Sequence, residues 1–343
     1  SIYFHQEVFM KKIWPALIFL LLLMPVTSTH AVQGKIQGEE PYTLPGWFKE
    51  SFLEIQDEIS DARDNNRHIM LFMHIDRCPY CTRLLEENFR TGENQAFMQK
   101  NFDVIALNIR GDREIIWDKD TRYSEKTLAR ELKVHFTPTL VFLDTDGKKV
   151  FQMNGYRKPD AFRQVLDYVH EKKYQQMKLV DYISQVIEPS YNFREHPQFV
   201  EIKDFSSIKE PLAIIFEDRG CVGCDEFHLE VLQHEDVLEE LKKFRVVRLD
   251  AVSTQSIIDT KGNKTTPKEW AKALKLDYRP GTVLYDGGDE ITRADGHLYH
   301  FHYKELLRYV SGSFYFEYPT YLAYLGPRQK QLLESGVNID FGK

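Results

Sequence analysis

Four cysteines are the residues whose spacing most clearly suggests chemistry in this sequence. They form two pairs, Cys78 with Cys81 and Cys221 with Cys224, and two residues separate the members of each pair. A disulfide within such a pair closes a very short loop, so it removes little entropy from the unfolded chain and contributes little stability. No cysteine remains for a cross-link between distant segments. We therefore interpret both pairs as redox-active dithiols.

The surrounding residues predict how each pair would react. Each pair follows an apolar run typical of a buried strand and precedes a segment with helical character. A cysteine at a helix N-terminus faces free N–H groups and the positive end of the helix dipole, which favour the thiolate. Cys78 and Cys221 are the expected nucleophiles, and Cys81 and Cys224 are the expected resolving thiols. Pro79 suits the first helical position, where no N–H is needed.

Two other interpretations of the cysteines stay open at the level of sequence. Two Cys-x-x-Cys pairs would supply the four ligands of a structural zinc ion. Here, however, the pairs are 143 positions apart, whereas zinc ribbons place their pairs much closer together, so we expect no metal. The second alternative is a domain that keeps its fold with inert cysteines, which is more credible for the second pair than for the first.

The residue pattern predicts elements in the same order in both halves of the chain. The first half is expected to contain helices over 46–66, 82–89, 93–100, 124–133 and 159–172 and strands over 68–75, 103–109, 139–143 and 149–153, with a loop inserted at 110–123. The second half is expected to contain strands over 212–216, 245–250, 282–285 and 290–293 and helices over 226–233, 236–242, 267–276 and 302–310, with a polar insert at 254–266. This alternation is typical of an α/β domain.

Matching landmarks indicate an internal duplication at the scale of a domain. Pro138 lies 60 positions after the first cysteine of its half, and Pro280 lies 59 positions after the first cysteine of the other half. Asp144 and Asp286, which precede the two hairpin turns, lie 66 and 65 positions after the same cysteines. The distances from the first cysteine to these residues therefore agree between the two halves to within one position.

The first Cys-Pro-Tyr-Cys motif, with a strand before it and Thr137-Pro138 and a hairpin after it, resembles the thioredoxin superfamily. This resemblance implies a thiol–disulfide oxidoreductase in which Pro138 is cis and faces both sulfurs, and in which Thr137 pairs its backbone with the substrate. Arg279-Pro280 occupies the same place in the second half. The residues expected to contact substrate are Thr137, Pro138, Pro79, Tyr80, Arg279 and Pro280. The resemblance covers residues 46–172 firmly and about 205–312 less firmly.

Two further features place the chain within that superfamily. The dipeptide Pro79-Tyr80, between the first two cysteines, is the one usual in glutaredoxins. The long N-terminal helix and an export signal instead resemble periplasmic thioredoxin-like proteins, including those of sulfur-oxidation systems. The expected fold class is thus α/β, with two tandem thioredoxin-like domains, each a mixed sheet flanked by helices. The expected parts are a signal peptide with an upstream extension (1–31), a tether (32–45), domain 1 (46–172), a linker (173–204), domain 2 (205–325) and a tail (326–343).

The chain also departs from the superfamily pattern. Thioredoxin has a buried aspartate six positions before the first cysteine, where this chain has Phe72 and Ile215, so proton handling must differ. Arg279 is an unusual residue before the loop proline, and two roles stay open for it: supporting a thiolate at Cys221 or blocking substrate.

The charges beside the two pairs differ in sign. The second pair is crowded by acidic residues and the first by basic ones, namely Glu217, Asp218, Asp225 and Glu226 against Arg77 and Arg83. Because positive neighbours favour a thiolate, we predict that the first pair is the more oxidising. Electrons would then pass from Cys221/Cys224 to Cys78/Cys81.

The N-terminal residues predict export from the cytoplasm. Met10-Lys11-Lys12 begins a positive segment, an apolar run of about 12 residues follows, and cleavage is expected after Ala31. The run is shorter than the roughly 20 residues of a membrane span, so we expect a periplasmic protein without a stable span. The net charge of −7 and the lack of basic clusters argue against a nucleic-acid partner.

The remaining expectations concern partners and ligands. The expected partners are protein or small-molecule thiols and disulfides and a second redox protein that recharges the cysteines. No dissociable cofactor is needed, because the electrons reside in the sulfurs, and the histidines at 297, 300 and 302 make an incomplete ligand set for a metal. The alternative function is a binding module with little turnover, motivated by Arg279 and by the aromatic segment 314–324. That segment is expected to pack across a domain face, with a partner surface as the alternative.

Overall fold

The two halves of the chain form two mixed sheets with the same strand order in this computed structural model. The structure describes residues 33–134, 136–186 and 191–341, so the expected signal peptide and His135 lie outside the described residues. The sheet orders are β3-β2-β6-β7 and β9-β8-β12-β13. The strands of the first sheet are β2 (His68–His74), β3 (Phe102–Asn108), β6 (Thr139–Leu143) and β7 (Lys149–Asn154). Those of the second are β8 (Leu212–Glu217), β9 (Arg245–Asp250), β12 (Gly281–Asp286) and β13 (Asp289–Ala294).

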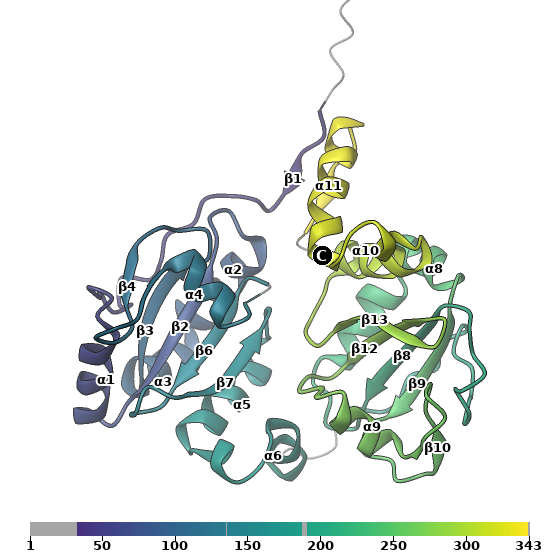
Figure 1. Cartoon of the computed structure of the whole chain (residues 1–343), viewed down its shortest axis with the longest axis horizontal. Coiled ribbons are helices and arrows are strands. Elements are labelled where there is room, and N and C mark those ends of the chain that lie inside the picture. Colours follow the sequence, from purple (N-terminus) through teal and green to yellow (C-terminus); the bar gives the residue numbers. More distant parts are fainter. Residues whose placement is uncertain (1–32, 135, 187–190, 342–343) are drawn as a thin grey trace, which may run out of the picture.

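Helices cover both faces of each sheet (Figure 1). In domain 1 they are α1 (Ile55–Asp64), α2 (Pro79–Leu84) with its π-helical continuation η1 (Leu85–Phe89), α3 (Gly92–Asn101), α4 (Glu125–Glu131) and α5 (Pro159–His170). In domain 2 they are α7 (Cys224–Glu226) with its continuation η3 (Phe227–Leu232), α8 (Glu235–Leu241), α9 (Pro267–Ala273) and α10 (His300–Ser311). The two tandem α/β domains expected from the duplication are confirmed, each with a mixed sheet flanked by helices.

The central strand of each sheet divides its domain into two apolar layers. Met70 and Phe72 of β2 point to the layer beneath α2, α3 and α5, while Leu71 and Met73 point to the layer beneath α1 and α4. The strand is buried along its whole length because helices cover both of its faces. The same alternation divides β8 in domain 2. Each disulfide loop begins where one of these buried strands ends.

The first helix is shorter than its periodicity indicates. The expected helix over 46–66 is wrong in its first part, because α1 begins only at Ile55. Leu53 has a positive φ of 64°, which interrupts a helix, and Phe52 is 95% exposed. Trp47 instead donates from Nε1 to the carbonyl of Phe89, 2.9 Å away, and packs on the opposite layer from Ile55. The apolar residues of segment 46–66 belong to two different core layers, although their spacing resembles that of a single amphipathic helix.

Both expected inserts contain short hairpins. The segment expected as a loop at 110–123 pairs β4 (Glu114–Ile116) with β5 (Arg122–Ser124), and Ile115 is fully buried under α1 and α4. In domain 2, β10 (Ile257–Ile258) pairs with β11 (Lys264–Thr265). The few apolar residues of these polar stretches anchor them to the core.

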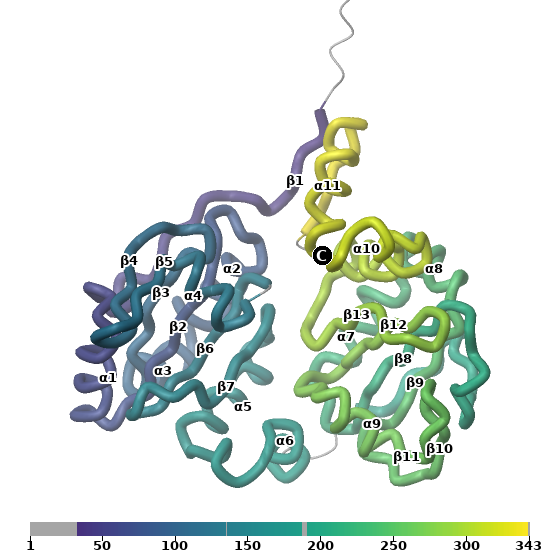
Figure 2. Tube along the Cα trace, viewed as in Figure 1, coloured from purple at the N-terminus to yellow at the C-terminus, as the bar shows by residue number. Residues whose placement is uncertain are grey.

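The two ends of the described chain meet each other. Strand β1 (Ile36–Gln37), in the expected tether, pairs in parallel with β14 (Ile339–Asp340), in the expected tail. Figure 2 shows β1 beside α11, at the C-terminal end of the chain. Helix α11 (Tyr321–Glu334) runs across the expected boundary at 325/326. In the aromatic segment, Tyr321 and Tyr324 are buried in the core of domain 2, so the expected packing on a domain face is confirmed, although Phe316 is exposed.

The expected linker is shared between the domains. Helix α6 (Leu179–Val186) buries Leu179 and Tyr182 in the core layer of domain 1, whereas Tyr191 packs on the second disulfide.

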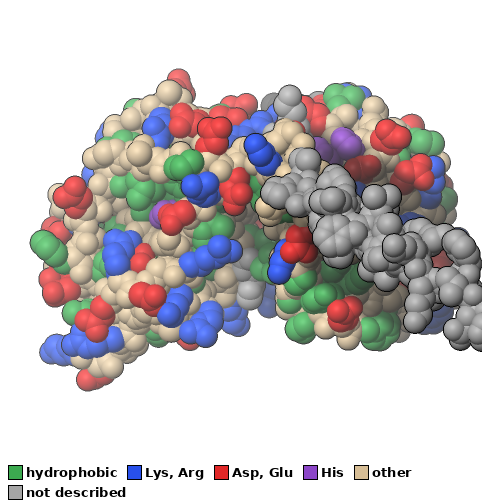
Figure 3. Space-filling view, turned by 90° about the horizontal axis from the view of Figure 1, so that it is seen from above, with side chains coloured by type: hydrophobic (Ala, Val, Ile, Leu, Met, Phe, Trp, Pro, Cys, Tyr) green, Lys and Arg blue, Asp and Glu red, His purple; other side chains and the backbone are tan. Residues whose placement is uncertain are grey.

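On the face seen in Figure 3, basic and acidic side chains are interspersed over both lobes. Among the described residues, no helix has the length and apolar character needed to cross a bilayer.

Candidate functional site

The first dithiol lies at the amino end of α2, where β2 has just ended. Cys78 is the N-cap and Pro79 begins the helix, as the sequence predicts. Cys78 and Cys81 form a disulfide. The backbone N–H of Cys81 donates to Cys78 Sγ at 3.1 Å, so a free N–H of the first helical turn points at the sulfur. Cys81 is fully buried and Cys78 is only 4% exposed, which makes Cys78 the more accessible sulfur.

The loop before β6 closes over this disulfide. The Thr137-Pro138 peptide bond is cis, as the resemblance implies. The Thr137 hydroxyl oxygen lies 3.5 Å from Cys78 Sγ, so the loop faces the sulfur. Gly155, after β7, donates its N–H to the carbonyl of Pro138 at 2.8 Å and holds the loop against the sheet.

Tyr80, expected to contact substrate, instead lies against domain 2. Its ring stacks on Tyr299 with 5.1 Å between centroids. Its hydroxyl accepts the N–H of Tyr299 at 3.1 Å and lies 3.1 Å from Nδ1 of His302. Burial raises the pKa of Tyr80 and lowers the pKa of His302 to about 3. The loop of the first disulfide is therefore part of the domain interface.

A buried histidine beneath the first site was missed by sequence reasoning. His74 lies four positions before Cys78, and the Tyr42 hydroxyl lies 2.7 Å from its Nδ1. The same hydroxyl donates its one proton to the carbonyl of Ile75 at 2.7 Å. The hydrogen bond between His74 and Tyr42 therefore needs a proton on Nδ1 of His74, which donates to the hydroxyl oxygen. Burial lowers the pKa of His74. Tyr42 comes from the expected tether, outside the repeated unit.

The second dithiol differs from the first in its relation to the helix. Cys221 and Cys224 form a disulfide, but α7 begins at Cys224 with Gly223 as its N-cap. Cys221 thus precedes the cap, and the expectation that it lies at the mouth of the helix is wrong. A Cβ on Gly223 would lie 3.0 Å from the Tyr278 hydroxyl, so a side chain at this position would have to displace that hydroxyl.

Arg279 is held by an acidic neighbour rather than by the sulfurs. The Arg279-Pro280 bond is cis, like its counterpart in domain 1. Arg279 donates from Nε to Asp218 Oδ2 at 3.1 Å and from Nη1 to the carbonyl of Tyr278 at 3.0 Å. Burial raises the pKa of Asp218, and the nearby Arg279 cation opposes that shift. This contact makes Arg279 part of the wall beside Cys221, and both roles that the sequence left open for it stay predictions.

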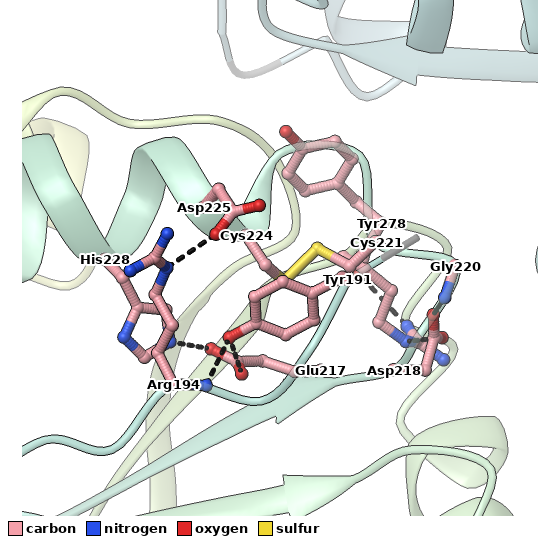
Figure 4. The surroundings of a disulfide bond; sticks show 11 residues. Tyr191, Arg194, Glu217, Asp218, Gly220, Cys221, Cys224, Asp225, His228 and Tyr278 are labelled. Carbon is pink, nitrogen blue, oxygen red and sulfur yellow. Dashed lines mark hydrogen bonds and ion pairs between the residues drawn. A yellow bond between two sulfur atoms is a disulfide. The ribbon is translucent and has the colours of Figure 1, made fainter. Parts of the chain in front are cut away.

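A buried polar triad lies beneath the second disulfide (Figure 4). The Tyr191 ring packs against Cys221 and Cys224, and its hydroxyl donates to Glu217 Oε2 at 2.9 Å. The other oxygen of Glu217 lies 2.6 Å from His228 Nε2. Glu217 is fully buried and His228 is 2% exposed. Glu217 also lies four positions before the first cysteine, so both sites bury a titratable side chain at this place.

The acidic residues around the second pair all have partners. Besides the contacts of Glu217 and Asp218, Asp225 lies 2.5 Å from Arg194, and Glu226 lies 2.7 Å from Lys158 of domain 1. The unopposed negative charge counted from the sequence is therefore largely compensated. Near the first pair, Arg83 pairs with Glu87 at 2.7 Å.

No metal centre is formed by the cysteines or by the histidines at 297, 300 and 302. Each cysteine pair is bonded within itself, and across residues 33–134, 136–186 and 191–341 no group of three or more potential ligands could hold a metal ion. His302 contacts Tyr80, and His300 stacks on His234 at 3.8 Å between centroids. Burial lowers the pKa of His297 to about 4.

Comparisons with known proteins agree with this geometry. The model of the thioredoxin-like domain family matches residues 55–170 and 199–311. Mouse anterior gradient protein 3 is 33% identical over 95 residues, which are 27% of this chain and 58% of that protein. The match thus spans a little over half of that relative.

Solved structures with similar folds each cover less than half of this chain. A thioredoxin-fold protein from Helicobacter pylori is 22% identical with a TM-score of 0.32, and the match covers 38% of this chain and 96% of that one. A disulphide isomerase from Xylella fastidiosa is 17% identical with a TM-score of 0.27 and covers 38% of this chain and 97% of its own.

Proposed function

The chain belongs to the thioredoxin-like family in both of its halves, and on that premise we propose that it is a thiol–disulfide oxidoreductase with two dithiol sites. One observation carries the proposal. In each half, a Cys-x-x-Cys disulfide lies between the end of a buried strand and a helix, with a cis-proline peptide bond in the corresponding loop. A structural staple would not require this arrangement twice.

The proposed reaction is two successive exchanges at one pair. In the reduced protein, the Cys78 thiolate attacks a substrate disulfide, forms a bond with one sulfur and releases the other as a thiolate. Cys81 then loses its proton, attacks Cys78 Sγ and releases the second substrate thiol. Two electrons pass to the substrate, the released thiolates take up protons, and the protein is left with the disulfide. A dithiol donor reverses these steps. Cys221 and Cys224 take the same roles in domain 2.

The surrounding residues have supporting roles in this proposal. Thr137 and Pro138 shape the substrate groove beside Cys78, and Pro79 starts the helix that stabilises its thiolate. Arg279 and Pro280 form the corresponding wall beside Cys221. Tyr80, whose ring contacts domain 2, is proposed to orient the loop rather than to bind substrate.

The proposed setting is outside the cytoplasm, in the periplasm. The positive start and short apolar run at the N-terminus support export, and an oxidising compartment suits paired cysteines. The proposed partners are proteins or small molecules with thiols or disulfides, together with a redox protein that recharges the sites.

A binding module with little turnover is the second candidate. It is favoured by one observation: the Tyr80 side chain, in the loop of the first disulfide, is engaged by Tyr299 and His302 of domain 2. In this candidate, domain contacts keep the first site closed.

Trapping distinguishes the two candidates. Cys81→Ala should accumulate mixed disulfides through Cys78, because the resolving thiol is absent. Cys224→Ala makes the same test at Cys221, and Cys78→Ala/Cys81→Ala/Cys221→Ala/Cys224→Ala is the control that should trap nothing. Adducts are read by non-reducing electrophoresis and mass spectrometry. Normal partner binding without any trapped adduct would support the binding module instead.

A further inference from the structure

Cys221 lies in a cleft of about 470 Å³ between the two domains. The wall from domain 2 holds the disulfide loop and charged side chains of both signs. The wall from domain 1 comes from β7, α5 and α6 (Figure 1) and combines apolar with polar side chains. Its apolar residues include Phe151, Met153, Val165, Leu179, Val180 and Ile183, and its polar residues include Gln152, Gln164 and Ser184.

Direct contacts between the domains narrow this cleft. The guanidinium of Arg157, from domain 1, lies 3.7 Å from the centre of the Tyr278 ring. Tyr278 belongs to domain 2 and lies two positions before Pro280. A Cβ on Gly220 would lie 3.9 Å from Cγ2 of Ile183, so α6 runs beside the residue preceding Cys221. A Cβ on Gly296 would lie 3.2 Å from the carbonyl oxygen of Asn154, which is tighter than most van der Waals contacts. Both domains therefore build the surroundings of one dithiol.

We propose that the second dithiol exchanges with disulfides of peptide size, in which a cysteine is carried by a short extended segment. Disulfides in the body of a folded protein would be excluded. This inference rests on the proposed function, which it refines for Cys221 and Cys224. The first dithiol does not line this cleft, so the inference concerns the second site alone.

The size of the cleft supports this substrate class. Its volume falls within the roughly 300 to 1,000 Å³ that encloses ligands of drug-like size. A disulfide in a folded protein would have to pass between α6 and the loop of Cys221, where Ile183 and Gly220 already lie close together. A short segment needs only the free space that the cleft holds.

The chemistry of the two walls supports a peptide. Asp277 and the ion pair of Arg279 with Asp218 give the domain 2 wall polar groups beside which the amides of a short chain can lie. Burial and the nearby Asp295 carboxylate raise the pKa of Asp277. Asp295 accepts the backbone N–H groups of Asp277 and Tyr278, the latter at 2.9 Å, which keeps this wall in place. The apolar side chains of the opposite wall, among them Val180 and Ile183, suit an aliphatic side chain beside the cysteine.

The exchange balances in the same way as at the first site. The Cys221 thiolate forms a bond to one sulfur of the peptide disulfide and releases the other as a thiolate, which takes up a proton. Cys224 then loses its proton and closes the disulfide with Cys221, releasing the second peptide thiol. The peptide is reduced by two electrons, and an external dithiol restores the pair.

The test compares two reagents that share one reacting group and differ in size. Cys78→Ala/Cys81→Ala leaves only the second dithiol, which is reduced and mixed with 2,2′-dipyridyl disulfide or with the pyridyl disulfide of a long polyethylene glycol. Release of pyridine thione measures the rate of exchange with each reagent. The same two rates for the chain unfolded in urea give the intrinsic ratio between the small and the large reagent. We expect the folded protein to favour the small reagent by about tenfold or more beyond that ratio, because access controls exchange.

A variant that wedges the domains apart provides the matched comparison. Gly296→Val places a side chain against Asn154 and should bring the size preference to within about threefold of the intrinsic ratio. Gly46→Val is the control, because nothing lies within 4 Å of a Cβ there, and it should keep the full preference. Circular dichroism checks that both variants are folded.

A second arm tests the apolar wall with cysteinyl tripeptide disulfides. The second dithiol should react faster with a leucine-flanked disulfide than with an aspartate-flanked one, and Ile183→Asp should remove or reverse that order. Equal rates for small and large reagents at Cys221, or no preference between the tripeptides, would overturn the cleft proposal and leave the oxidoreductase proposal standing. Failure of both dithiols to exchange with any of these disulfides would overturn the oxidoreductase proposal itself.

Discussion

At the scale of single residues, both sites bury a titratable side chain four positions before the first cysteine. In domain 1 it is His74, held by Tyr42, and in domain 2 it is Glu217, held by Tyr191 and His228. Thioredoxin has a buried aspartate six positions before its first cysteine, where this chain has Phe72 and Ile215. The sequence contains a signal for the shifted place, since a polar residue ends each apolar strand. The tyrosines carry no such signal, because they come from segments outside the repeat.

The triad beneath the second disulfide yields a prediction about stability. His228→Leu would leave the fully buried Glu217 with Tyr191 as its one remaining partner in the triad, and removing one partner of a buried acceptor costs up to about 3 kcal/mol of unfolding free energy. Glu217→Gln keeps an acceptor for Tyr191 and should cost less, about 1 kcal/mol. Urea unfolding followed by fluorescence measures both values. Equal and small losses in the two variants would show that the pair contributes little to the fold.

At the scale of elements, the two dithiols are related differently to their helices. Cys78 is the N-cap of α2 and accepts an N–H of the first turn, whereas Cys221 precedes the cap of α7. A thiolate at Cys78 is therefore better stabilised by the helix N-terminus. The predicted order of oxidising strength stays the same as from the sequence, but its basis moves from local charge, which ion pairs largely compensate, to helix capping.

Elements repeated in both halves were predictable, and elements that depend on tertiary contacts were not. The offset between cysteine and proline located the loops of Pro138 and Pro280 because both copies had to keep that geometry. The start of α1 was misplaced because helical periodicity does not reveal that Leu53 takes a positive φ. The place of Tyr80 was also missed, because its partners lie more than 200 positions away, in domain 2.

At the scale of the whole molecule, the domains act on each other's sites. Domain 2 covers the loop of the first disulfide through Tyr299 and His302, and domain 1 supplies one wall of the cleft around Cys221. The pairing of β1 with β14 adds a further connection between the N-terminal segment and the C-terminal end. The duplication has thus produced one molecule in which neither site is built by a single domain alone.

The interface should weaken in acid. Burial holds the pKa of His302 at about 3, whereas an unfolded histidine titrates near 6.5, so the unfolded chain binds the proton first. The stability that neutral His302 provides is present above about pH 6.5 and is lost progressively as the pH falls toward 3. His302→Gln should reduce the drop in melting temperature between pH 7 and pH 4, whereas the same change at the exposed His170 should not. An unchanged drop in His302→Gln would contradict this role.

A redox titration of the full chain in glutathione buffers, with each pair followed separately by thiol alkylation and peptide mass spectrometry, is the decisive experiment. We expect both pairs to interconvert reversibly between dithiol and disulfide, and Cys78/Cys81 to be reduced at the more positive potential. A pair that stays locked in one state across the whole range would contradict its role in exchange, and a reversed order would contradict the helix-capping argument.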